Sequence, residues 1–468
     1  MGEWTGDRVE RFFQEIKGKR IAFCGIGGSN LPLIEMFHKK GAYVLACDKK
    51  TKEELGEKAQ RLEKQNITLC LGEDYLKNLN ADVIFRTPGM KYHMPELEQA
   101  RQNGVVVTSE MEVFFDLCPC KIVAVTGSDG KTTTTTIISE MLKASGKRVH
   151  LGGNIGHPLL PDIEDIQPDD IAVVELSSFQ LISMRKSPDI AVVTNITPNH
   201  LDIHKDMAEY IDAKKNILLH QNAFGRAVLN LDNDITKGFA AVTRGETLLF
   251  SRRKPSKNGA WLRDDGVLVM SYHGKTFSVL AAKDILIPGA HNVENYLAAI
   301  TALWEIVPLE AMVQVAKTFG GVEHRTELVR ELHGVRYYND SIASSPTRCI
   351  SGTLSLFPQK IVLIAGGYDK KIPFDALGPV IVDKVKLLIL LGNTADKIEK
   401  AVTDSISYCK GNPEIIRVHS MDEAVQTAFE KTSSGDIVAL SPACASFDLY
   451  PNFEARGKHF KQLVNALK

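Results

Sequence analysis

The sequence contains no long apolar run and no surplus of charge of either sign. No apolar stretch approaches the ~18 residues needed to cross a bilayer, and the N-terminal segment MGEWTGDRVERFFQEIKGKR is charged throughout. Lys and Arg, at 56, nearly balance Asp and Glu, at 57, so no net field favours nucleic acid or an anionic membrane. We therefore expect a cytoplasmic protein with small-molecule partners, binding neither nucleic acid nor membrane.

The sequence also lacks paired-cysteine motifs, repeats and low-complexity tracts. Its eight cysteines are scattered. The closest pair, Cys118 and Cys120, is separated by one proline, which fits neither a C-x-x-C redox motif nor the spacing of zinc ligands. We interpret the cysteines as buried, reduced thiols. With no repeat to extend a single core, the 468 residues predict about three domains.

Three blocks of the sequence alternate short apolar runs with helix-like segments, a pattern typical of parallel α/β sheets. We therefore expect an α/β protein with domains at 1–117, 118–322 and 323–468, plus a small antiparallel excursion within 225–287. Ligands bind beyond the carboxyl ends of parallel strands, so polar residues there are candidates for chemistry. The expected strands lie in RIAFCGIGG, AYVLACD, DVIFRTPG, VVVTSE, KIVAVTGSDG, DIAVVELSS, DIAVVTNITPNH, KIVLIAGGYDK, VKLLILLGN and GDIVALSPACAS.

One strand-to-helix turn, TGSDGKTT, has the composition of a phosphate loop. Its spacing is shorter than the Walker A pattern G-x-x-x-x-G-K-[ST], because its glycines are Gly127 and Gly130. Backbone N–H groups and a helix N-terminus would face an anion, with Lys131 as a mobile cation and Thr132 as a magnesium ligand. The turn therefore indicates a nucleoside triphosphate site. The alternative is a Gly-rich turn with an incidental lysine.

Further candidates follow at the next strand ends. Glu175 closes an apolar strand, where a carboxylate can complete a magnesium shell beside Thr132; the alternative is a solvated acid. The next strand leads into a loop with three potential ligands, and a helix with a lysine follows. Those residues are His200, Asp202, His204 and Lys214.

Two asparagines, Asn292 and Asn295, stand one turn apart at a helix start. Spacing of three residues places both side chains on one helical face, where they could hydrogen-bond an adenine edge or phosphates. A plain N-cap is the competing interpretation of Asn292.

Read in order, the motifs resemble those of the Mur ligases, ATP-dependent amide ligases with a similarly shortened phosphate loop. The similarity extends through all three blocks, and the closing motif favours the members that add D-glutamate. The motifs are TGSDGKTT, GGNIG, ELSSFQL, NITPNHLDIH, YIDAK, GAHNVEN, EHR, YNDS, GGYDK and SPACASFDLYPNFEARGKHF.

The resemblance implies a reaction and an architecture. A Rossmann-like N-terminal domain would bind the UDP end of UDP-N-acetylmuramoyl-L-alanine, and a central P-loop-type ATPase domain would bind ATP. A Rossmann-like C-terminal domain would bind D-glutamate. The acid would be activated as an acyl phosphate and joined to D-glutamate for peptidoglycan synthesis, by a monomer with ATP and two magnesium ions. Closure of the C-terminal domain would assemble the site.

The resemblance also assigns roles to residues. The residues that it implies as ATP ligands are Gly127, Ser128, Asp129, Gly130, Lys131, Thr132, Thr133, Asn292, Asn295, Arg325 and Asp340. Catalysis falls to Lys131, Glu175, His200 and Lys214. Metal binding falls to Thr132, Glu175, His200 and Lys214. Substrate binding falls to Gly25, Ser29, Asp48, Asn154, Ser177, His200, Lys370, Ser446 and Phe453. An ammonium has no lone pair for a metal, so Lys214 is expected to be carbamylated by carbon dioxide.

Other functions stay open at this point. Within the ligases, a sister enzyme with another amino acid acceptor and folyl-polyglutamate synthase are the alternatives. A non-catalytic nucleotide-binding switch would not need the Lys370 and Ser446 pair. An oxidoreductase would suit GIGGSN followed by Asp48, but Asn30 replaces the third glycine of G-x-G-x-x-G. Two positions depart from the family pattern, Asp129 where Asn is more frequent and Ile342 where Lys is frequent.

Overall fold

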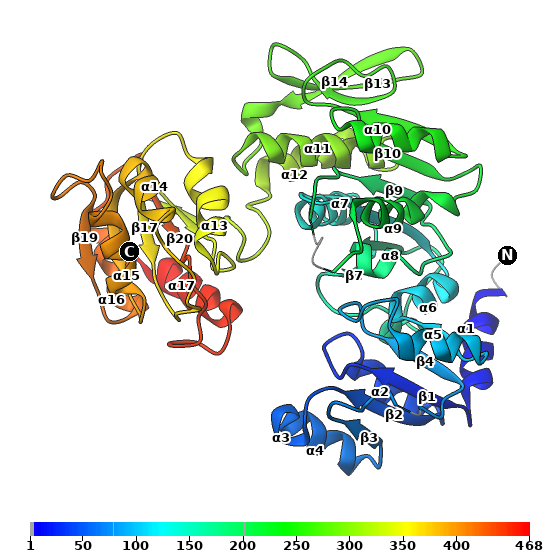
Figure 1. The fold of residues 1–468 in the computed structure, drawn as a ribbon. Coiled ribbons are helices and arrows are strands. Elements are labelled where there is room, and N and C mark those ends of the chain that lie inside the picture. Colours follow the sequence, from blue (N-terminus) through cyan, green and yellow to red (C-terminus); the bar gives the residue numbers. More distant parts are fainter. Residues whose placement is uncertain (1–3, 78, 200–202) are drawn as a thin grey trace. The chain divides into compact units, whose positions relative to one another are not determined.

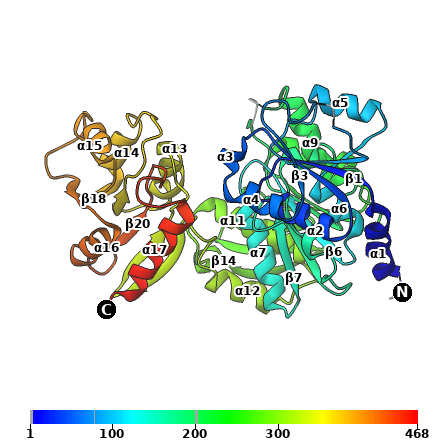
Figure 2. The same ribbon diagram turned by 90° about the horizontal axis from the view of Figure 1, so that it is seen from below.

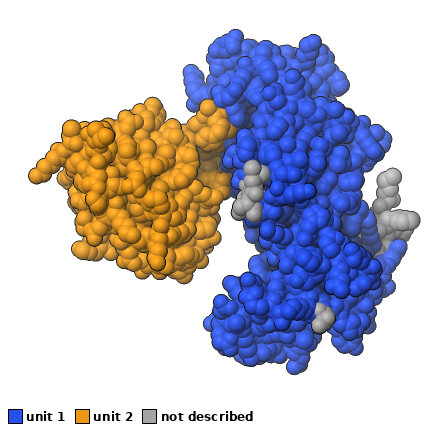
Figure 3. Space-filling view, viewed as in Figure 1, with its two compact units in different colours: residues 1–284, 293–315 blue, residues 285–292, 316–468 orange. Residues whose placement is uncertain are grey.

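The computed structural model describes residues 4–77, 79–199 and 203–468. The chain divides into two compact units, residues 1–284 with 293–315 and residues 285–292 with 316–468 (Figure 3). Both units contain mainly parallel sheets flanked by helices, which confirms the predicted fold class. The three predicted domain ranges stay a prediction.

The first sheet of unit 1 is parallel, with the strand order β3-β2-β1-β4-β5 (Figure 1). All its strands except β3 were predicted from apolar runs; β3 is short and only partly buried. The strands are β1 Arg20–Cys24, β2 Tyr43–Asp48, β3 Thr68–Leu71, β4 Val83–Arg86 and β5 Val106–Thr108. The helices of this part are α1 Trp4–Ile16, α2 Leu31–Lys39, α3 Lys52–Leu55, α4 Glu57–Lys64, α5 Pro95–Gln102 and α6 Glu110–Leu117.

The central sheet of unit 1 is also parallel, in the order β11-β10-β9-β6-β8-β7. Its strands are β6 Lys121–Thr126, β7 Val149–Gly153, β8 Ile171–Glu175, β9 Ile190–Val193, β10 Arg226–Asn230 and β11 Glu246–Phe250. The α-helices that follow α6 are α7 Lys131–Ala144, α8 Ser178–Leu181, α9 Met207–Leu219, α10 Asp234–Gly238, α11 Ala290–Leu303 and α12 Leu309–Thr318. Short 3₁₀ turns occupy Leu160–Asp162, Phe239–Val242 and Ala282–Asp284.

The predicted antiparallel excursion is confirmed but is shorter than the range given for it. Strands β12 Gly259–Leu262, β13 Val267–Tyr272 and β14 Lys275–Ala281 form a three-stranded antiparallel sheet. Strands β10 and β11 fall in the same range, yet they extend the main parallel sheet. β10 pairs with β9 and β11 pairs with β10, through contacts that the local sequence pattern does not contain.

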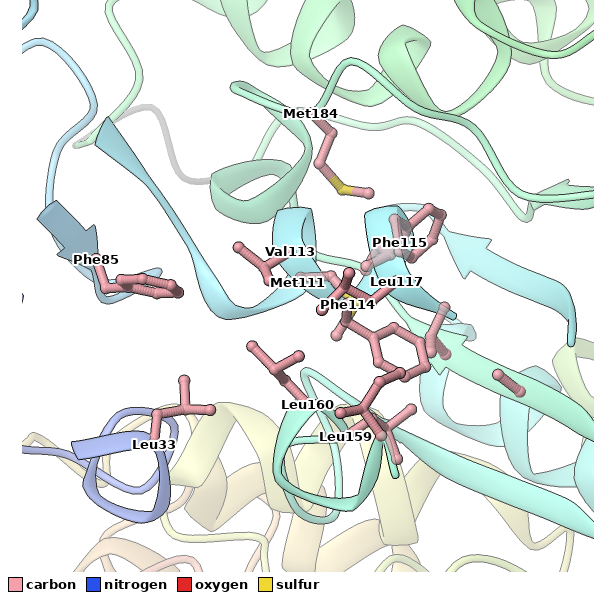
Figure 4. Packing of buried hydrophobic residues seen from close by; sticks show 14 of the residues in the cluster. Leu33, Phe85, Met111, Val113, Phe114, Phe115, Leu117, Leu159, Leu160 and Met184 are labelled. Atoms are coloured by element: carbon pink, nitrogen blue, oxygen red, sulfur yellow. The ribbon is translucent and has the colours of Figure 1, made fainter. Parts of the chain in front are cut away.

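One hydrophobic core runs from the first sheet to the central sheet. Ile21 and Phe23 of β1 enter this core, whereas Ala22 and Cys24 enter a second core on the other face of the sheet. Figure 4 shows Leu33 and Phe85 near side chains of α6 and of the 3₁₀ turn at Leu160–Asp162. This shared core joins the first and the central sheets of unit 1 through apolar packing.

The sheet of unit 2 has the order β15-β16-β20-β17-β18-β19, parallel except for the β15–β16 pair. Figure 2 shows α14 and α15 on one side of it and α16 and α17 on the other. The strands are β15 Glu327–Leu332, β16 Val335–Asn339, β17 Ile361–Ala365, β18 Val385–Leu390, β19 Glu414–Arg417 and β20 Ile437–Leu440. The helices are α13 Pro346–Cys349 with a π turn at Ile350–Leu354, α14 Leu377–Lys384, α15 Ala395–Thr403, α16 Met421–Glu430 and α17 Phe453–Ala466.

Side chains of β17 explain this double layer. Ile361, Leu363 and Ala365 pack in a core with α14 and α15, whereas Val362 and Ile364 pack in a core with α16 and α17. A strand buried on both faces has a continuous apolar sequence. The run KIVLIA therefore predicts β17 correctly.

Candidate active site

The shortened phosphate loop joins β6 to α7, and both α7 and α9 lie against the central sheet (Figure 1). Gly127 has φ +152° and Gly130 has φ +78°. A Cβ atom on Gly127 would lie 1.9 Å from Thr194 Oγ1, and one on Gly130 would lie 2.5 Å from Asn295 Oδ1. Both positions therefore require glycine, because the loop is pressed against its neighbours in a conformation that other residues rarely adopt.

The residues between these glycines are held by neighbouring backbone. The Ser128 hydroxyl donates to the Thr197 carbonyl at 2.9 Å and pairs with the Tyr210 hydroxyl, also at 2.9 Å. The Asp129 N–H donates to Asn195 Oδ1 at 2.9 Å. The Ser128 side chain thus shapes the loop, and the Asp129 backbone is fixed to the segment after β9.

Helix α7 starts directly after the loop, at Lys131. Lys131 Nζ donates to the Ser128 carbonyl at 2.9 Å, so the ammonium folds back over the loop. The N–H groups of a first helical turn, here including that of Thr133, have no intrahelical partner and can bind phosphate oxygens. Threonines form helices poorly, but here the hydroxyls of Thr135 and Thr136 bond to carbonyls four residues back at 2.8 Å.

Two side chains donate hydrogen bonds to Glu175 at the end of β8. Thr132 Oγ1 donates to Glu175 Oε2 at 2.7 Å, and Asn154 Nδ2 donates to Glu175 Oε1 at 2.7 Å. The carboxylate is buried, at 1% exposure. Gly153 lets the β7 end approach, because a Cβ there would lie 2.3 Å from the Glu175 carbonyl. Oxygen atoms so clustered suit a hard cation such as magnesium.

Lys214 of α9 is buried below the same loop, at 2% exposure. Its Nζ donates to the Gly127 carbonyl at 2.8 Å and to Thr126 Oγ1 at 3.3 Å. It also lies 4.9 Å from the centre of the Tyr210 ring. Burial, followed by the nearby charge of Lys131, lowers the pKa of Lys214 to about 7. A sizeable fraction of this amine is therefore neutral at neutral pH.

The loop after β9 is described only in part. The predicted ligands His200 and Asp202 lie outside the described residues. His204 is buried, with Nε2 2.8 Å from Ser178 Oγ and its ring stacked on Phe179 at 5.0 Å. His204 therefore packs against α8, where its ring contacts Ser178 and Phe179.

Ser177, predicted to bind substrate, is the N-cap of α8. Its backbone N–H donates to Gln180 Oε1 at 2.9 Å and its hydroxyl accepts from the Gln180 N–H at 3.3 Å, and these two bonds form a capping box. This cap fixes the backbone that follows Glu175.

In the first sheet, Asp48 holds the loop after β1. Its Oδ2 accepts from the Ile26 N–H at 2.7 Å. Gly25 has φ +100°, and a Cβ there would lie 2.8 Å from Thr87 Cγ2. Asn30 Nδ2 donates to the Gly25 carbonyl at 3.1 Å, and Ser29 beside it is partly buried. Asn30 thus stabilises the loop where a dinucleotide fingerprint has its third glycine.

The two asparagines of α11 have different local partners. Asn295 Oδ1 accepts from Thr134 Oγ1 at 3.1 Å, which ties the helix to α7 within unit 1. Asn292 Nδ2 donates to the Pro288 carbonyl at 2.6 Å within unit 2.

In unit 2, Asp340 follows β16 and is buried. Its Oδ2 accepts from the hydroxyls of Thr353 at 2.7 Å and Ser441 at 3.1 Å, and its Oδ1 accepts from the Thr326 N–H at 3.2 Å. Burial raises the pKa of Asp340 to about 6. Arg325, one residue before Thr326, lies close enough to oppose that rise by its charge.

The predicted acceptor residues stand on loops of unit 2. Lys370 is exposed, with Nζ 3.5 Å from both the carbonyl and the hydroxyl of Ser344. Ser446 is buried, and its carbonyl accepts from the Leu449 and Tyr450 N–H groups at 3.0 and 2.8 Å. Phe453 begins α17 and accepts at its carbonyl from Ser341 Oγ at 2.8 Å.

Comparison with known proteins places this architecture in a family. The chain matches the Mur ligase middle domain over residues 125–303, the "Mur ligase, glutamate ligase domain" over 324–444 and the MurD-like N-terminal domain over 19–109. It is 53% identical to the UDP-N-acetylmuramoylalanine--D-glutamate ligase of Acetivibrio thermocellus, covering 98% of this chain and 99% of that protein. The enzyme of that name from Clostridium botulinum is 50% identical, with coverage of 98% and 99%.

The chain belongs to the Mur ligase family. Solved structures agree with its fold. The MurC UDP-N-acetylmuramate-alanine ligase of Thermotoga maritima matches with TM-score 0.56 at 17% identity, covering 96% of this chain and 100% of that one. A UDP-N-acetylmuramoyl-L-alanyl-D-glutamate--2,6-diaminopimelate ligase matches with TM-score 0.58 at 18% identity, covering 97% and 93%.

The structure of this Mur ligase also identifies supporting residues that sequence reasoning missed. Tyr210 contacts both Ser128 and Lys214, and its position one helical turn before Lys214 was the available signal. Buried Arg456 of α17 donates to the carbonyls of Ser341, Cys444 and Ala445 at 2.9, 3.1 and 3.0 Å. It thereby holds the loop that leads to Ser446. Burial lowers the pKa of Arg456 to about 10.

Proposed function

We propose that this Mur ligase joins D-glutamate to UDP-N-acetylmuramoyl-L-alanine at the expense of ATP, in cytoplasmic peptidoglycan precursor synthesis. The observation that carries the proposal is identity of about 50% along nearly the whole chain to enzymes named for that reaction. The match of residues 324–444 to a glutamate ligase domain supports the same acceptor.

The chemistry requires activation of the acid. An ionised carboxylate resists attack by an amine, and hydroxide is a poor leaving group. Phosphorylation by ATP, with magnesium neutralising the transferring charge, supplies an acyl phosphate that expels phosphate instead. The amine of D-glutamate then adds, and the tetrahedral adduct loses phosphate.

In this proposal the phosphate loop binds the ATP phosphates. The Gly130 to Thr133 turn directs N–H groups of α7 toward the anion, and Lys131 stabilises the transferring charge. Asn295 lies so close to Gly130 that only glycine fits at this left-handed position of the loop. Asn292, Asn295, Arg325 and Asp340 are proposed to hold the rest of ATP.

Thr132 and Glu175 fit one magnesium ion. They present a hydroxyl and a carboxylate oxygen 2.7 Å apart, and magnesium prefers oxygen ligands with water and phosphate completing the shell. Among the residues that the structure describes, no group of three or more His, Cys, Asp and Glu could hold a metal by itself. Phosphate oxygens of the bound nucleotide and water would complete the shell.

A second magnesium ion is proposed at Lys214 and His200, with Lys214 carbamylated. A carbamate reverses the charge of the side chain and supplies two oxygens. Carbon dioxide adds to a neutral amine, and the buried position of Lys214 supports its neutral form. Lys214 Nζ lies beside the Gly127 carbonyl, so the modification would stand under the phosphate loop.

The remaining substrate contacts are proposed as follows. Gly25, Ser29 and Asp48 bind the uridine diphosphate end through the loop that Asp48 shapes. Asn154 and Ser177, which flank Glu175, bind the sugar-peptide end together with His200. Lys370, Ser446 and Phe453 bind D-glutamate.

We further propose a cytoplasmic monomer without nucleic-acid or membrane partners. The nearly balanced charge supports small-molecule partners. No helix in residues 4–77, 79–199 and 203–468 is long and apolar enough to cross a membrane.

Phosphate release by the purified protein tests the function. Release should require ATP, magnesium, UDP-N-acetylmuramoyl-L-alanine and D-glutamate together. Equal turnover with L-lysine or meso-diaminopimelate would reassign the acceptor to that of a sister ligase, and turnover with folate plus L-glutamate would indicate a folyl-polyglutamate synthase. ATP binding without turnover on any acceptor would indicate a nucleotide-dependent switch.

A further inference from the structure

Cys118 and Cys120 bring their sulfur atoms together at the junction of α6 and β6. The two Sγ atoms lie 3.5 Å apart, and Cys118 Sγ is also 3.7 Å from the Cys120 carbonyl. Cys118 is the C-cap of α6, and Cys120 directly precedes β6. The intervening proline restricts the backbone between them, so the proximity of the sulfurs is built into the junction.

A cavity lies beside the junction. Cys118 is partly exposed, whereas Cys120 is buried at 7% exposure. Pro119 between them lines a cavity of about 520 Å³, together with Phe13 and Gln14 of α1. Cys118 is the more accessible of the two residues, although Pro119 and not either cysteine lines the cavity.

The hydrogen bond between the thiols gives the two sulfurs different properties. It holds the pKa of Cys120 below its usual range, because Cys118 donates to the Cys120 thiolate. The same bond raises the pKa of Cys118, with burial adding to the effect. The Ala172 N–H gives the Cys120 thiolate further support. Thiolates are the nucleophiles of thiol–disulfide exchange.

We propose that Cys118 and Cys120 form a reversible dithiol–disulfide site that exchanges with low-molecular-weight disulfides. Cys118 attacks one sulfur of the small disulfide as its proton passes along the hydrogen bond to the Cys120 thiolate, forming a mixed disulfide and releasing one small thiolate. Cys120 gives this proton to the released thiolate and is again a thiolate. The Cys120 thiolate then attacks the Cys118 sulfur and expels the second small thiolate. The two cysteine protons end on the two released thiols. The protein dithiol is oxidised, the small disulfide is reduced, and excess small thiol reverses both steps.

The other cysteines provide internal comparisons. Cys409 is exposed, and among the described residues no other cysteine is hydrogen-bonded to it. Its reaction with a small disulfide should therefore stop at the mixed disulfide. Cys349 is fully buried and bonded to the Ser441 carbonyl at 3.4 Å, so it should not react in the folded protein. The pair lies at the start of β6, whereas the phosphate loop follows the end of that strand. Oxidation should therefore leave the proposed ligase site in place.

Peptide mass spectrometry tests the proposal on the full-length protein. The reduced protein is freed of reductant, treated with oxidised glutathione, blocked with N-ethylmaleimide and digested with trypsin. Residues 102–121 form one tryptic peptide containing Cys118 and Cys120 and no other cysteine. This peptide should be two hydrogens lighter and carry no maleimide, whereas the peptide 401–410 should carry glutathione on Cys409. Maleimide on both Cys118 and Cys120, beside glutathionylated Cys409, would overturn the proposal.

Two variants resolve the order of attack. Cys120→Ser should trap glutathione stably on Cys118, because the second nucleophile is gone. Cys118→Ser should slow the reaction of Cys120 by at least about tenfold, since the remaining thiol is buried. If Cys120→Ser accumulates no adduct, Cys118 is not the attacking sulfur and the proposal fails. The wild-type measurement stands by itself if either variant folds poorly.

Discussion

Thr132 Oγ1 donates a 2.7 Å hydrogen bond to Glu175 Oε2, which joins the first turn of α7 to the end of β8. The bond places a hydroxyl and a buried carboxylate directly beside the phosphate loop. Asn154 holds the other carboxylate oxygen at 2.7 Å, so Glu175 is oriented from both sides. Such an oriented carboxylate is what a magnesium–nucleotide complex needs.

Glu175→Gln should strongly reduce phosphate release while preserving the fold. The amide keeps the shape of the side chain but removes the charge that a metal requires, and we expect a loss of roughly 10²–10³-fold. The assay is turnover against magnesium concentration, with circular dichroism as the folding check. Glu140→Gln, an acid on the same α7 paired with Lys143, is the matched control. Unchanged turnover in Glu175→Gln would remove this residue from the metal site.

Lys131→Ala should abolish turnover without unfolding the protein. The Lys131 ammonium bonds to a loop carbonyl and contributes charge to the site, whereas the apolar core lies elsewhere. Lys143→Ala, in the last turn of the same helix, should retain activity. The measurements are steady-state phosphate release and thermal denaturation. Wild-type activity of folded Lys131→Ala would contradict the phosphate-loop assignment.

Lys214→Ala should lose most activity, whereas Lys215→Ala should stay close to the wild type. Lys214 is buried under the loop, but Lys215 pairs with Asp212 on the outer face of α9. If Lys214 is carbamylated, a small carboxylate such as acetate or formate should partly restore Lys214→Ala. Intact-protein mass spectrometry can miss this labile group, so ¹³C NMR with labelled carbon dioxide is the direct readout. Absence of a carbamate signal in the active, magnesium-bound enzyme would rule the modification out.

Lys370→Ala should raise the KM for D-glutamate far more than the KM for ATP. Loss of one charge-assisted hydrogen bond is worth about 1.5–3 kcal/mol, or roughly 10- to 150-fold. Ser446→Ala should act in the same direction. Lys384→Ala, at a partly exposed lysine of unit 2 paired with Asp383, is the control. A selective ATP defect would move Lys370 to the nucleotide side.

Glu110→Gln should change how stability depends on pH. Glu110 Oε1 accepts from the N–H groups of Leu159 and Leu160 at 2.9 Å, and burial raises the pKa of Glu110 from 4.5 to about 7. The folded protein thus keeps this proton to about pH 7, whereas the unfolded chain loses it near pH 4.5. Relative to Glu110→Gln, wild-type stability should be fully present below about pH 4.5 and fall as pH rises to about 7, by on the order of 3 kcal/mol.

Melting temperatures of both proteins across this pH range provide the measurement. The melting temperature of the wild type should fall relative to that of Glu110→Gln from pH 4.5 to pH 7, and the difference should then stay constant. A gap that does not vary with pH would show that Glu110 ionises at its ordinary pKa in the folded protein.

The sequence by itself determined the elements whose signals are local. Strands buried on both faces, such as β6 and β17, read as continuous apolar runs. The phosphate loop could also be predicted from the sequence, because a strand, two glycines, a lysine and a helix start occur in succession. Short or half-buried strands such as β3 and β19 were missed because their stability comes from pairing with a neighbour.

Only the tertiary structure decided which distant residues meet. Thr132 and Glu175 are far apart in the chain, and their 2.7 Å contact follows from the pairing of β6 with β8. The support of Lys214 by Tyr210 and the clamp of Arg456 on the loop before Ser446 likewise depend on packing between elements. Composition and periodicity describe what each segment prefers, but contacts across the core arise only when the sheets assemble and exclude water.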